Sequence, residues 1–199
     1  MRTRLSWAAA ITAMLRILGL GVVGRAAIAA VCVLAAMTAS AHALEATEAA
    51  VEAAFLFKFG FFVEWPASAF ASGDSPMTLC IVGDDPFGAL LDDAVKGQKI
   101  GNRPVVVRRM SAVSRDSGCH IVYLSETGNS PPETLAALRG SDVLTVTDSS
   151  ADDSAVGIIN FVIKDNHVRF DIDDAAAASG GLVISSRLLN IALDVKPRH

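Results

Sequence analysis

A short polar segment after the first predicted strand is where this chain could most readily do chemistry. Met77 to Val82 is apolar enough for a buried strand, and Gly83-Asp84-Asp85-Pro86-Phe87-Gly88 follows it directly. Open α/β sheets bind ligands beyond the carboxyl ends of their strands, so this segment could line a crevice for a small molecule. Its two aspartates have the wrong charge for a phosphate site and fit a divalent cation better. We favour a simpler role, in which Asp85 caps a helix that starts at Pro86.

Residues suited to nucleophilic catalysis are few. His120 follows Cys119, but neighbouring residues of a strand point to opposite faces, so the imidazole cannot activate that sulfur. His167 is expected at an exposed turn, and Ser185-Ser186 at the start of a helix rather than in a strained Gly-x-Ser-x-Gly turn. Neither cysteine of the later chain, Cys80 or Cys119, has the spacing of a metal ligand. The sequence therefore predicts no catalytic residue, no metal site and no cofactor, and favours a binding protein over an exported hydrolase.

Residues 1–43 have the pattern of a signal peptide. Their charged residues are four arginines, the run Ala26 to Ala39 is apolar, and Ala41-His42-Ala43 matches a small-x-small cleavage site. A retained membrane anchor is the alternative, although the apolar run after Arg25 is short for a spanning helix. We predict cleavage, no membrane insertion of the processed chain, and a mature protein of residues 44–199 that folds as a single domain.

The net charge and the cysteine count change when the predicted leader is removed. The full chain has 17 Lys and Arg against 21 Asp and Glu, and the leader contains four of the basic residues and none of the acidic ones, so the mature charge is 13 − 21 = −8. Such an acidic surface disfavours nucleic acid as a partner. Cys80 and Cys119 remain, and an even number of cysteines in an exported protein favours a disulfide over buried free thiols.

A phenylalanine-rich stretch opens the mature chain and must be covered by the rest of the fold. Five of the nine phenylalanines fall between Phe55 and Phe62. Helical and strand spacing both align apolar residues here, but the flanking helix formers favour a helix that begins near Ala46. Pro66 is expected to end this helix. Trp65, at the helix exit, fits a core position and a contact site for a partner equally well.

Strands and helices alternate through the middle of the chain. Apolar segments predict the strands, and segments with helix caps predict the helices between them. This alternation is typical of an α/β fold, a three-layer sandwich with a mainly parallel sheet. The predicted strands are residues 77–82, 103–109, 119–124 and 143–146, and the predicted helices are residues 86–96 and 132–139.

The alternation ends with a predicted C-terminal antiparallel β-hairpin. Residues 156–164 and 167–172 are apolar-polar runs joined at Asp165-Asn166, a favoured tight turn. Gly157 permits a close approach of another backbone segment at the start of the first strand. Asn160 lies in an otherwise apolar strand and must find hydrogen-bond partners if it is buried. Neighbouring backbone is the favoured partner for Asn160, ahead of a ligand.

Two short helices are predicted beyond the hairpin. Asp173-Asp174 caps an alanine-rich helix that Gly180-Gly181 closes. Leu182 to Ile184 is expected to be extended. Ser185 or Ser186 then opens a last helix that runs to about Asp194.

Several blocks of the mature chain together carry a family resemblance. The stretch Phe55 to Pro66 ends in Phe-Val-Glu-Trp-Pro, and further blocks follow in order at Leu79 to Gly88, Gly118 to Ser125, Val143 to Asp148, Gly157 to Val162, Val168 to Ile172 and Ile184 to Leu189. These blocks cover nearly the whole mature chain and resemble the YfiR-like family of exported bacterial proteins. Some members carry a second cysteine pair near the hairpin, which this chain lacks.

The resemblance implies a periplasmic regulatory protein that is not an enzyme. Such a protein binds the periplasmic sensor domain of an inner-membrane diguanylate cyclase and holds it inactive, which restrains cyclic di-GMP signalling and biofilm formation. The resemblance also implies an outer-membrane lipoprotein that sequesters the protein. A second copy of the chain, in a homodimer, is a further expected partner. A periplasmic small-ligand sensor that uses the crevice at Gly83 to Gly88 is the alternative function.

The residues expected to bind the partner lie in three parts of the chain. These parts are Trp65, the hairpin and the last helix. In the hairpin, Lys164, Arg169 and Asp171 alternate with apolar residues and give one polar face. Such a face is commonly only solvated, but a hairpin at the edge of a sheet can also dock a partner. The predicted set is Trp65, Asn160, Phe161, Lys164, Arg169, Asp171, Arg187 and Leu188.

Overall fold

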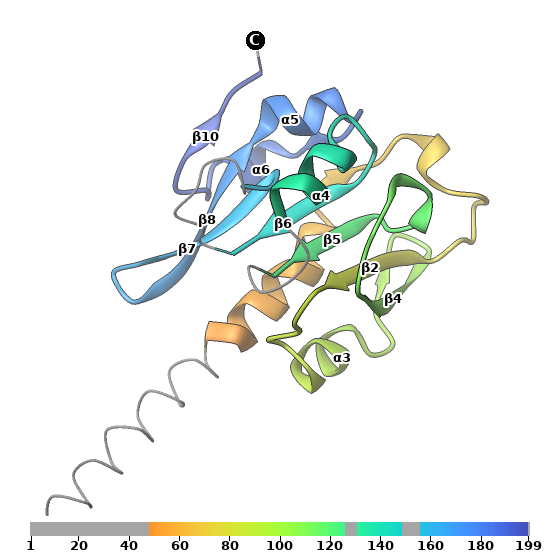
Figure 1. The fold of residues 1–199 in the computed structure, drawn as a ribbon, viewed down its shortest axis with the longest axis horizontal. Helices are drawn as coiled ribbons and strands as arrows, with labels where there is room; N and C mark the ends of the chain where they lie inside the picture. The colour runs from red at the N-terminus through yellow and green to blue at the C-terminus, as the bar shows by residue number, and fades with distance from the viewer. Residues whose placement is uncertain (1–47, 126–130, 149–155, 199) are drawn as a thin grey trace, which may run out of the picture. The chain divides into compact units, whose positions relative to one another are not determined.

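A computed structural model of the chain describes residues 48–125, 131–148 and 156–198 (Figure 1). All of these residues fall within one compact unit, Thr47–His199. The predicted signal peptide, residues 1–43, lies outside the described residues. Within the described ranges, no helix is both long enough and apolar enough to cross a membrane.

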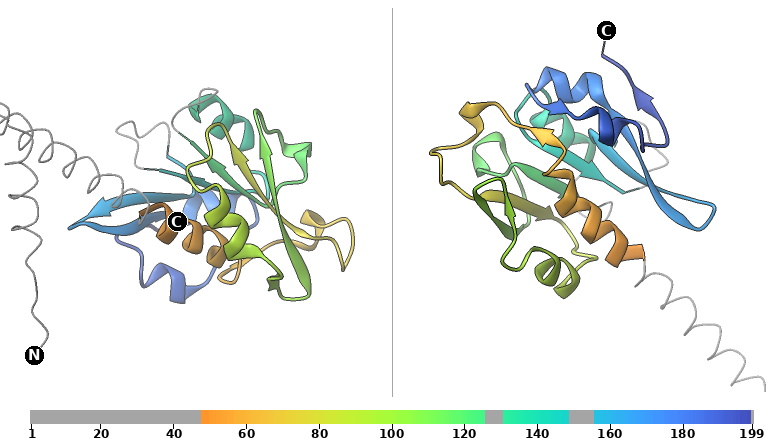
Figure 2. Two further views of the ribbon diagram at one scale, coloured as in Figure 1. Left: turned by 90° about the horizontal axis from the view of Figure 1, so that it is seen from below. Right: turned by 180° about the vertical axis from the view of Figure 1, so that it is seen from behind.

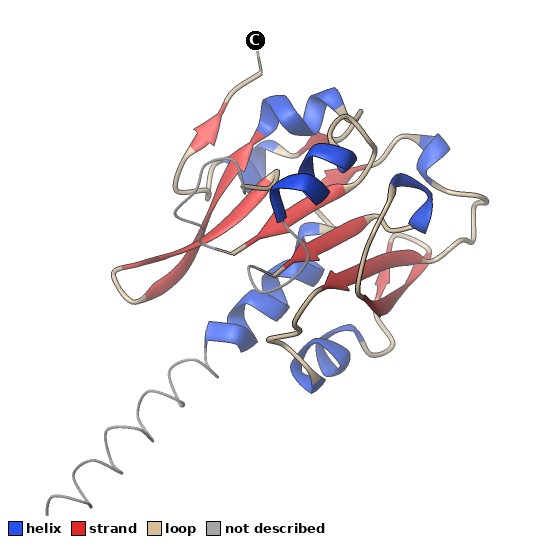
Figure 3. Cartoon of the chain, viewed as in Figure 1, coloured by secondary structure: helices blue, strands red, loops and turns tan. Residues whose placement is uncertain are grey.

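The fold is built on a sheet of eight strands in the order β10-β8-β7-β6-β5-β2-β4-β3 (Figures 1 and 3). Strands β4, β2, β5, β6 and β7 run parallel to one another, whereas β8 is antiparallel to β7 and β3 is antiparallel to β4. This arrangement confirms the predicted mainly parallel sheet with a C-terminal antiparallel hairpin. The strands are β2 (Met77–Val82), β3 (Lys99–Ile100), β4 (Arg103–Met110), β5 (Ile121–Leu124), β6 (Leu144–Thr147), β7 (Ile159–Lys164), β8 (His167–Asp173) and β10 (Val195–Lys196).

Helices pack on both faces of this sheet, so the fold has the three layers that the alternation predicts (Figure 2). The side chains of β2 show the two faces, because Leu79 and Ile81 belong to a larger core and Cys80 to a smaller one. The helix of residues 48–59 and helix α3 (Ala89–Val95) pack into the larger core. Helix α4 (Pro131–Leu138) packs into the smaller one.

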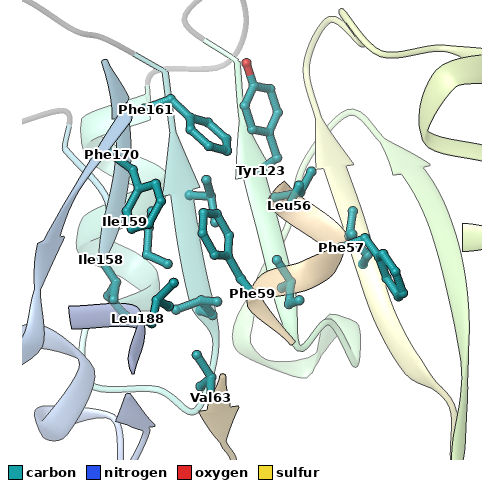
Figure 4. Packing of buried hydrophobic residues seen from close by; sticks show 14 of the residues in the cluster. Leu56, Phe57, Phe59, Val63, Tyr123, Ile158, Ile159, Phe161, Phe170 and Leu188 are labelled. Carbon is teal, nitrogen blue, oxygen red and sulfur yellow. The ribbon is translucent and has the colours of Figure 1, made fainter. Parts of the chain in front are cut away.

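Phenylalanine rings from the helix of residues 48–59 and from the hairpin form the centre of the larger core. The ring of Phe59 lies 5.7 Å from that of Phe161 and 5.2 Å from that of Phe170, and Figure 4 shows the three rings gathered together. Edge-to-face and offset contacts at these distances add to the stabilisation from burial. The phenylalanine cluster is therefore mainly a core feature, although Phe61 is half exposed.

The first helix ends earlier than predicted. Its last helical residue is Phe59, and a turn over residues 60–62 leads into strand β1 (Val63–Glu64). Strand β1 pairs in antiparallel fashion with β9 (Val183–Ile184), far along the chain. The pairing explains the error, because the alternating apolar residues around Phe61 fit a strand as well as a helix and the partner strand is remote in sequence. Pro66 follows β1 and does not end the helix.

Two further helix predictions need correction. Helix α3 begins at Ala89 rather than Pro86, with Gly88 as its N-cap at φ +48°, a conformation that glycine adopts without strain. The last helix, α6 (Ser186–Leu189), is only one turn long. The chain then turns and adds β10 beside β8, which the sequence did not reveal because a two-residue strand has no measurable periodicity.

The hairpin and the helix after it follow the prediction. Asp165 and Asn166 both have positive φ angles, 51° and 61°, as a tight two-residue turn of type I′ requires. Asp173 caps helix α5 (Asp174–Ser179), its side chain accepting the backbone N–H of Ala176 at 2.7 Å. Gly180 is the C-cap of the same helix. Two short 3-10 helices, η1 (Ala67–Ala69) and η2 (Arg115–Ser117), complete the described elements.

Candidate functional site

The crevice predicted at the end of β2 is occupied by the protein's own side chains. One carboxylate oxygen of Asp85 accepts the backbone N–H groups of Phe87 and Gly88, at 2.8 and 3.0 Å. Arg109 donates to the other oxygen at 2.6 Å and also binds both oxygens of Asp92. Burial alone would raise the pKa of Asp85, but these hydrogen bonds and the guanidinium hold it below its usual value. Asp85 therefore organises a turn, and both of its carboxylate oxygens are already used as acceptors.

His120 has a structural environment rather than a catalytic one. Its Nδ1 accepts the backbone N–H of Thr78 at 3.1 Å, so the ring proton is on Nε2, which donates to the carbonyl oxygen of Ala69 at 3.0 Å. Burial lowers the pKa of this imidazole. The ring stacks on Phe70, whose other neighbour is the guanidinium of Arg103. The neutral histidine thus fixes the loop after η1 to the sheet.

Cys80 and Cys119 form the predicted disulfide. It joins β2 to the residues just before β5, with a sequence separation of 39 between the two cysteines and 5.9 Å between their Cα atoms. Both residues are buried in the smaller core, beneath Met110 and Val113. Within the described part of the chain, no group of three or more potential metal-binding side chains is present.

The hairpin presents one polar face, as its alternating sequence predicts. Residues opposite each other in an antiparallel pair point to the same side, and the ladder pairs Asn160 with Asp171, Val162 with Arg169 and Lys164 with His167. Lys164 and Arg169 are exposed, while Asn160 is buried at the base of the hairpin. This face lies opposite the phenylalanine core.

A cavity of about 720 Å³ lies on the same side of the sheet, at the base of the hairpin. Its walls come from α4, β6, β8, α5 and the C-terminal strand β10. The acidic residues of the lining are Asp171, Asp173 and Asp194, and the basic ones are Arg139 and Lys196. Apolar lining residues include Leu135, Leu138, Val143 and Ile158. A volume of this size is in the range of small-molecule sites in proteins.

Asp171 connects the hairpin face with this cavity. Its carboxylate accepts the backbone N–H of Asp194, and burial followed by the nearby charge of Asp194 raises its pKa, although that hydrogen bond and Lys164 act in the opposite direction. The Oδ1 atom is inaccessible to solvent and has no hydrogen-bond partner among the residues that the structure describes. Such an oxygen is costly to leave unpaired.

Comparison with known proteins settles the family. The family model described as YfiR/HmsC-like matches residues 49–193, which is well over half of the chain. This chain belongs to the YfiR/HmsC-like family. The match includes the helix of residues 48–59 from its second residue, the whole sheet except β10, and the hairpin. No curated protein matches the chain.

Not all residues expected to bind a partner are accessible in this YfiR/HmsC-like protein. Phe161 is fully buried and Leu188 is 2% exposed, because both pack into the larger core, so we leave them out of the proposed contact surface. Arg187, next to Leu188, is exposed on α6. Trp65 packs against the larger core and is half-buried, and its indole Nε1 has no hydrogen-bond partner among the described residues.

One buried acid of this YfiR/HmsC-like chain was not evident from the sequence. Glu52 lies on the helix of residues 48–59 with 6% of its surface exposed. Burial, and then the charges of Asp148 and Glu48, raise its pKa to about 8. At helical spacing, Glu52 lies off the apolar face formed by Val51, Phe55 and Phe59. Asp148, just after β6, is near enough for its charge to act on Glu52, and this relation between distant parts of the chain leaves no local signal.

Ion pairs at the C-terminal strand were also missed. Arg198 donates to both oxygens of Asp174, at 2.7 and 2.9 Å, and Lys196 pairs with Asp173 at 2.9 Å. These pairs fasten β10 to the start of α5, beside the cavity. Their partners are more than twenty residues apart in sequence, which hides the relationship from any motif.

Proposed function

We propose that this protein is exported to the periplasm, where it binds the periplasmic sensor domain of an inner-membrane diguanylate cyclase and keeps the cyclase inactive. The family match over residues 49–193 is the observation that carries this proposal. The signal-peptide pattern of residues 1–43 supports export. Less cyclic di-GMP, and therefore less biofilm, is the expected consequence. Sequestration by an outer-membrane lipoprotein and formation of a homodimer are part of the same proposal.

Binding alone can produce this inhibition. A protein that binds the inactive conformation of a sensor domain more tightly than the active one shifts the population toward the inactive conformation. No chemical step is needed, so the regulator can act without catalytic residues. The size of the effect depends only on the difference between the two affinities.

The tip of the β7–β8 hairpin is the best-supported contact surface. Ile163 is 44% exposed on one face of the tip, and Lys164, the next residue of the strand, is exposed on the other face, so the tip offers an apolar anchor and a charge on opposite sides. At the base, Phe161 and Phe170 are fixed in the core. The base of the hairpin is therefore held in place, which limits the conformational entropy lost on binding and so favours affinity. Figure 1 shows this hairpin extending beyond the neighbouring strands.

Biolayer interferometry with the purified periplasmic domain of a diguanylate cyclase from the same genome tests the contact surface. The charge reversals Lys164→Glu and Arg169→Glu, and the change Ile163→Asp, should each weaken binding by about tenfold or more. Lys99→Glu is the matched control, because Lys99 is exposed on β3, at the opposite edge of the sheet. Equal losses for Lys99→Glu and Lys164→Glu would exclude the hairpin as the specific contact.

Cellular cyclic di-GMP tests the function itself. Deletion of the gene should raise cyclic di-GMP, and expression of the exported protein should reverse the rise. The variant Lys164→Glu, exported to the same level, should fail to reverse it, while Lys99→Glu should succeed. An unchanged cyclic di-GMP level after deletion, with the cyclase expressed, would contradict the proposed function.

A further inference from the structure

The η1 loop, residues 67–76, is attached to the sheet by two side chains. Every residue of this loop is at least partly exposed. Its hydrogen bonds to the rest of the described chain come from His120, whose Nε2 donates to the carbonyl oxygen of Ala69 at 3.0 Å, and from Arg103, which donates to two serine carbonyls of the loop at 2.8 Å. A segment with so few buried contacts opens at a lower free-energy cost than the sheet unfolds.

A stack of three side chains joins these two attachment points. The ring of Phe70 lies between the imidazole of His120, with 4.3 Å between ring centroids, and the guanidinium of Arg103, whose Cζ is 3.6 Å from the ring centroid. Arg103 belongs to β4, and His120 directly precedes β5. His120 is only 6% exposed, so the closed loop shields its ring from water.

The hydrogen bonds of His120 require a neutral ring. Its Nδ1 accepts the backbone N–H of Thr78 at 3.1 Å, while Nε2 is the donor to the loop. An imidazolium carries a proton on both nitrogens and accepts no hydrogen bond. Protonation in the closed state would therefore place two N–H groups against each other and leave a buried donor without its acceptor. In an open state the ring can turn into water and bind the proton without that cost.

The surroundings of His120 also disfavour its charged form. Burial lowers its pKa, and the charge of Arg103 acts in the same direction, whereas the carbonyl of Ala69 and the charge of Asp142, just before β6, act in the opposite direction. The contribution of the neutral ring to the closed state is therefore fully present above about pH 6.5 and is lost as the pH falls through the lowered pKa.

We propose that His120 is a pH-sensitive switch, whose neutral ring holds the η1 loop on the sheet and whose protonation at Nδ1 releases the loop while the sheet stays folded. The disulfide between Cys80 and Cys119 supports this division, because it joins β2 to the residue next to His120 and is independent of the loop. Trp65 lies close before the loop in sequence, so release would change the surroundings of a proposed contact residue. That consequence rests on the proposed function, whereas the switch itself does not.

NMR relaxation of the purified mature protein between pH 7.0 and pH 4.5 tests the switch without any partner. Amide order parameters of Ala69, Phe70 and Gly73 should fall from about 0.85 to below about 0.6, while those of β2 and β5 stay near 0.85. The imidazole carbon shifts of His120 should titrate with the same midpoint as the loop amides, because one protonation drives both changes.

Three variants separate the switch from a general effect of acid. His120→Gln does not titrate and should remove the pH dependence of the loop, whereas His167→Gln, at the exposed hairpin turn, should keep it. Asp142→Asn removes a charge that favours the imidazolium, so it should lower the midpoint by roughly 0.2–0.5 pH unit.

Three results would overturn the proposal. One is an η1 loop whose order parameters do not change over this pH range, and another is a sheet that loses order at the same midpoint as the loop. The third is a folded His120→Gln variant that keeps the transition. If His120→Gln does not fold, the unchanged protein still decides, because a His120 ring that titrates apart from the loop amides contradicts the switch.

Discussion

The hydroxyl of Thr147 donates a hydrogen bond of 2.7 Å to the side-chain oxygen of Asn160, between the neighbouring strands β6 and β7. The same hydroxyl accepts the backbone N–H of Gly157 at 3.0 Å. Thr147→Val should lower the free energy of unfolding by about 1–3 kcal/mol, because two buried polar groups lose their partner. Urea denaturation of the two proteins measures the difference.

A double-mutant cycle separates this hydrogen bond from other effects of the substitution. Asn160→Leu, alone and together with Thr147→Val, completes the cycle. If the bond stabilises the fold, the sum of the losses of unfolding free energy in the two single variants should exceed the loss in the double variant by at least about 0.5 kcal/mol. Strict additivity would show that the side chains act independently.

Gly157 lies where another backbone segment leaves no room for a side chain. A Cβ at this position would be 2.9 Å from the carbonyl oxygen of Thr145, closer than real contacts allow. Gly157→Ala should therefore lower the free energy of unfolding by roughly 1–3 kcal/mol, since the backbone must shift. Gly73→Ala, where a Cβ meets nothing within 4 Å, should change it by less than about 0.5 kcal/mol. Similar effects at the two glycines would refute the steric argument.

The disulfide between Cys80 and Cys119 should contribute substantially to stability. It closes a loop with a sequence separation of 39, and the double variant Cys80→Ser and Cys119→Ser should lose about 2–4 kcal/mol of unfolding free energy. Thermal unfolding with and without dithiothreitol provides the check. Reductant should lower the melting temperature of the unchanged protein and leave that of the double variant as it is. Two free thiols in the unreduced, denatured mature protein would contradict the bond.

Glu52 should make stability depend on pH in a defined direction. Its pKa is about 8 in the folded protein and near 4.5 when unfolded, so the folded state binds the proton more tightly. The contribution of Glu52 to stability is therefore fully present below about pH 4.5 and is lost as the pH rises through 8. Glu52→Gln should remove that decline and stabilise the protein at pH 8.5 by at least about 1 kcal/mol.

Urea midpoints measured between pH 5 and pH 9 test this dependence. The exposed Glu64→Gln is the matched control and should keep the slope of the unchanged protein. A slope that is the same in Glu52→Gln as in the unchanged protein would show that Glu52 does not carry the effect.

Local patterns predicted most of the sheet. The turn at Asp165-Asn166 and the cap at Asp173 were recognisable because their chemistry is complete within a few residues. The pairing of β1 with β9 was not, because the Phe-rich segment fits two periodicities and only Val183–Ile184 decides between them. Strand β10 is two residues long and owes its place to contacts with β8 and α5.

The candidate site shows the same division. Asp171 and Lys164 were predicted to share a polar face, because alternation along a strand gives this directly. The cavity beside them was not predictable, since its walls come from five elements that meet only in the folded chain. The buried Glu52 was missed for the same reason. Asp85 was expected to cap a helix that starts at Pro86. It does accept backbone N–H groups, but the helix begins at Ala89 with Gly88 as its N-cap, and Arg109 gives Asp85 a partner from a different strand.

The sheet keeps the two cores apart, with the phenylalanine cluster on one face and the disulfide on the other. Substitutions on opposite faces share few neighbours, so their effects on stability should be nearly additive. The face that bears the cavity and the polar side of the hairpin can therefore diverge between relatives while the aromatic face stays as it is. Such independence would let one scaffold acquire new specificities by mutation without losing its stability.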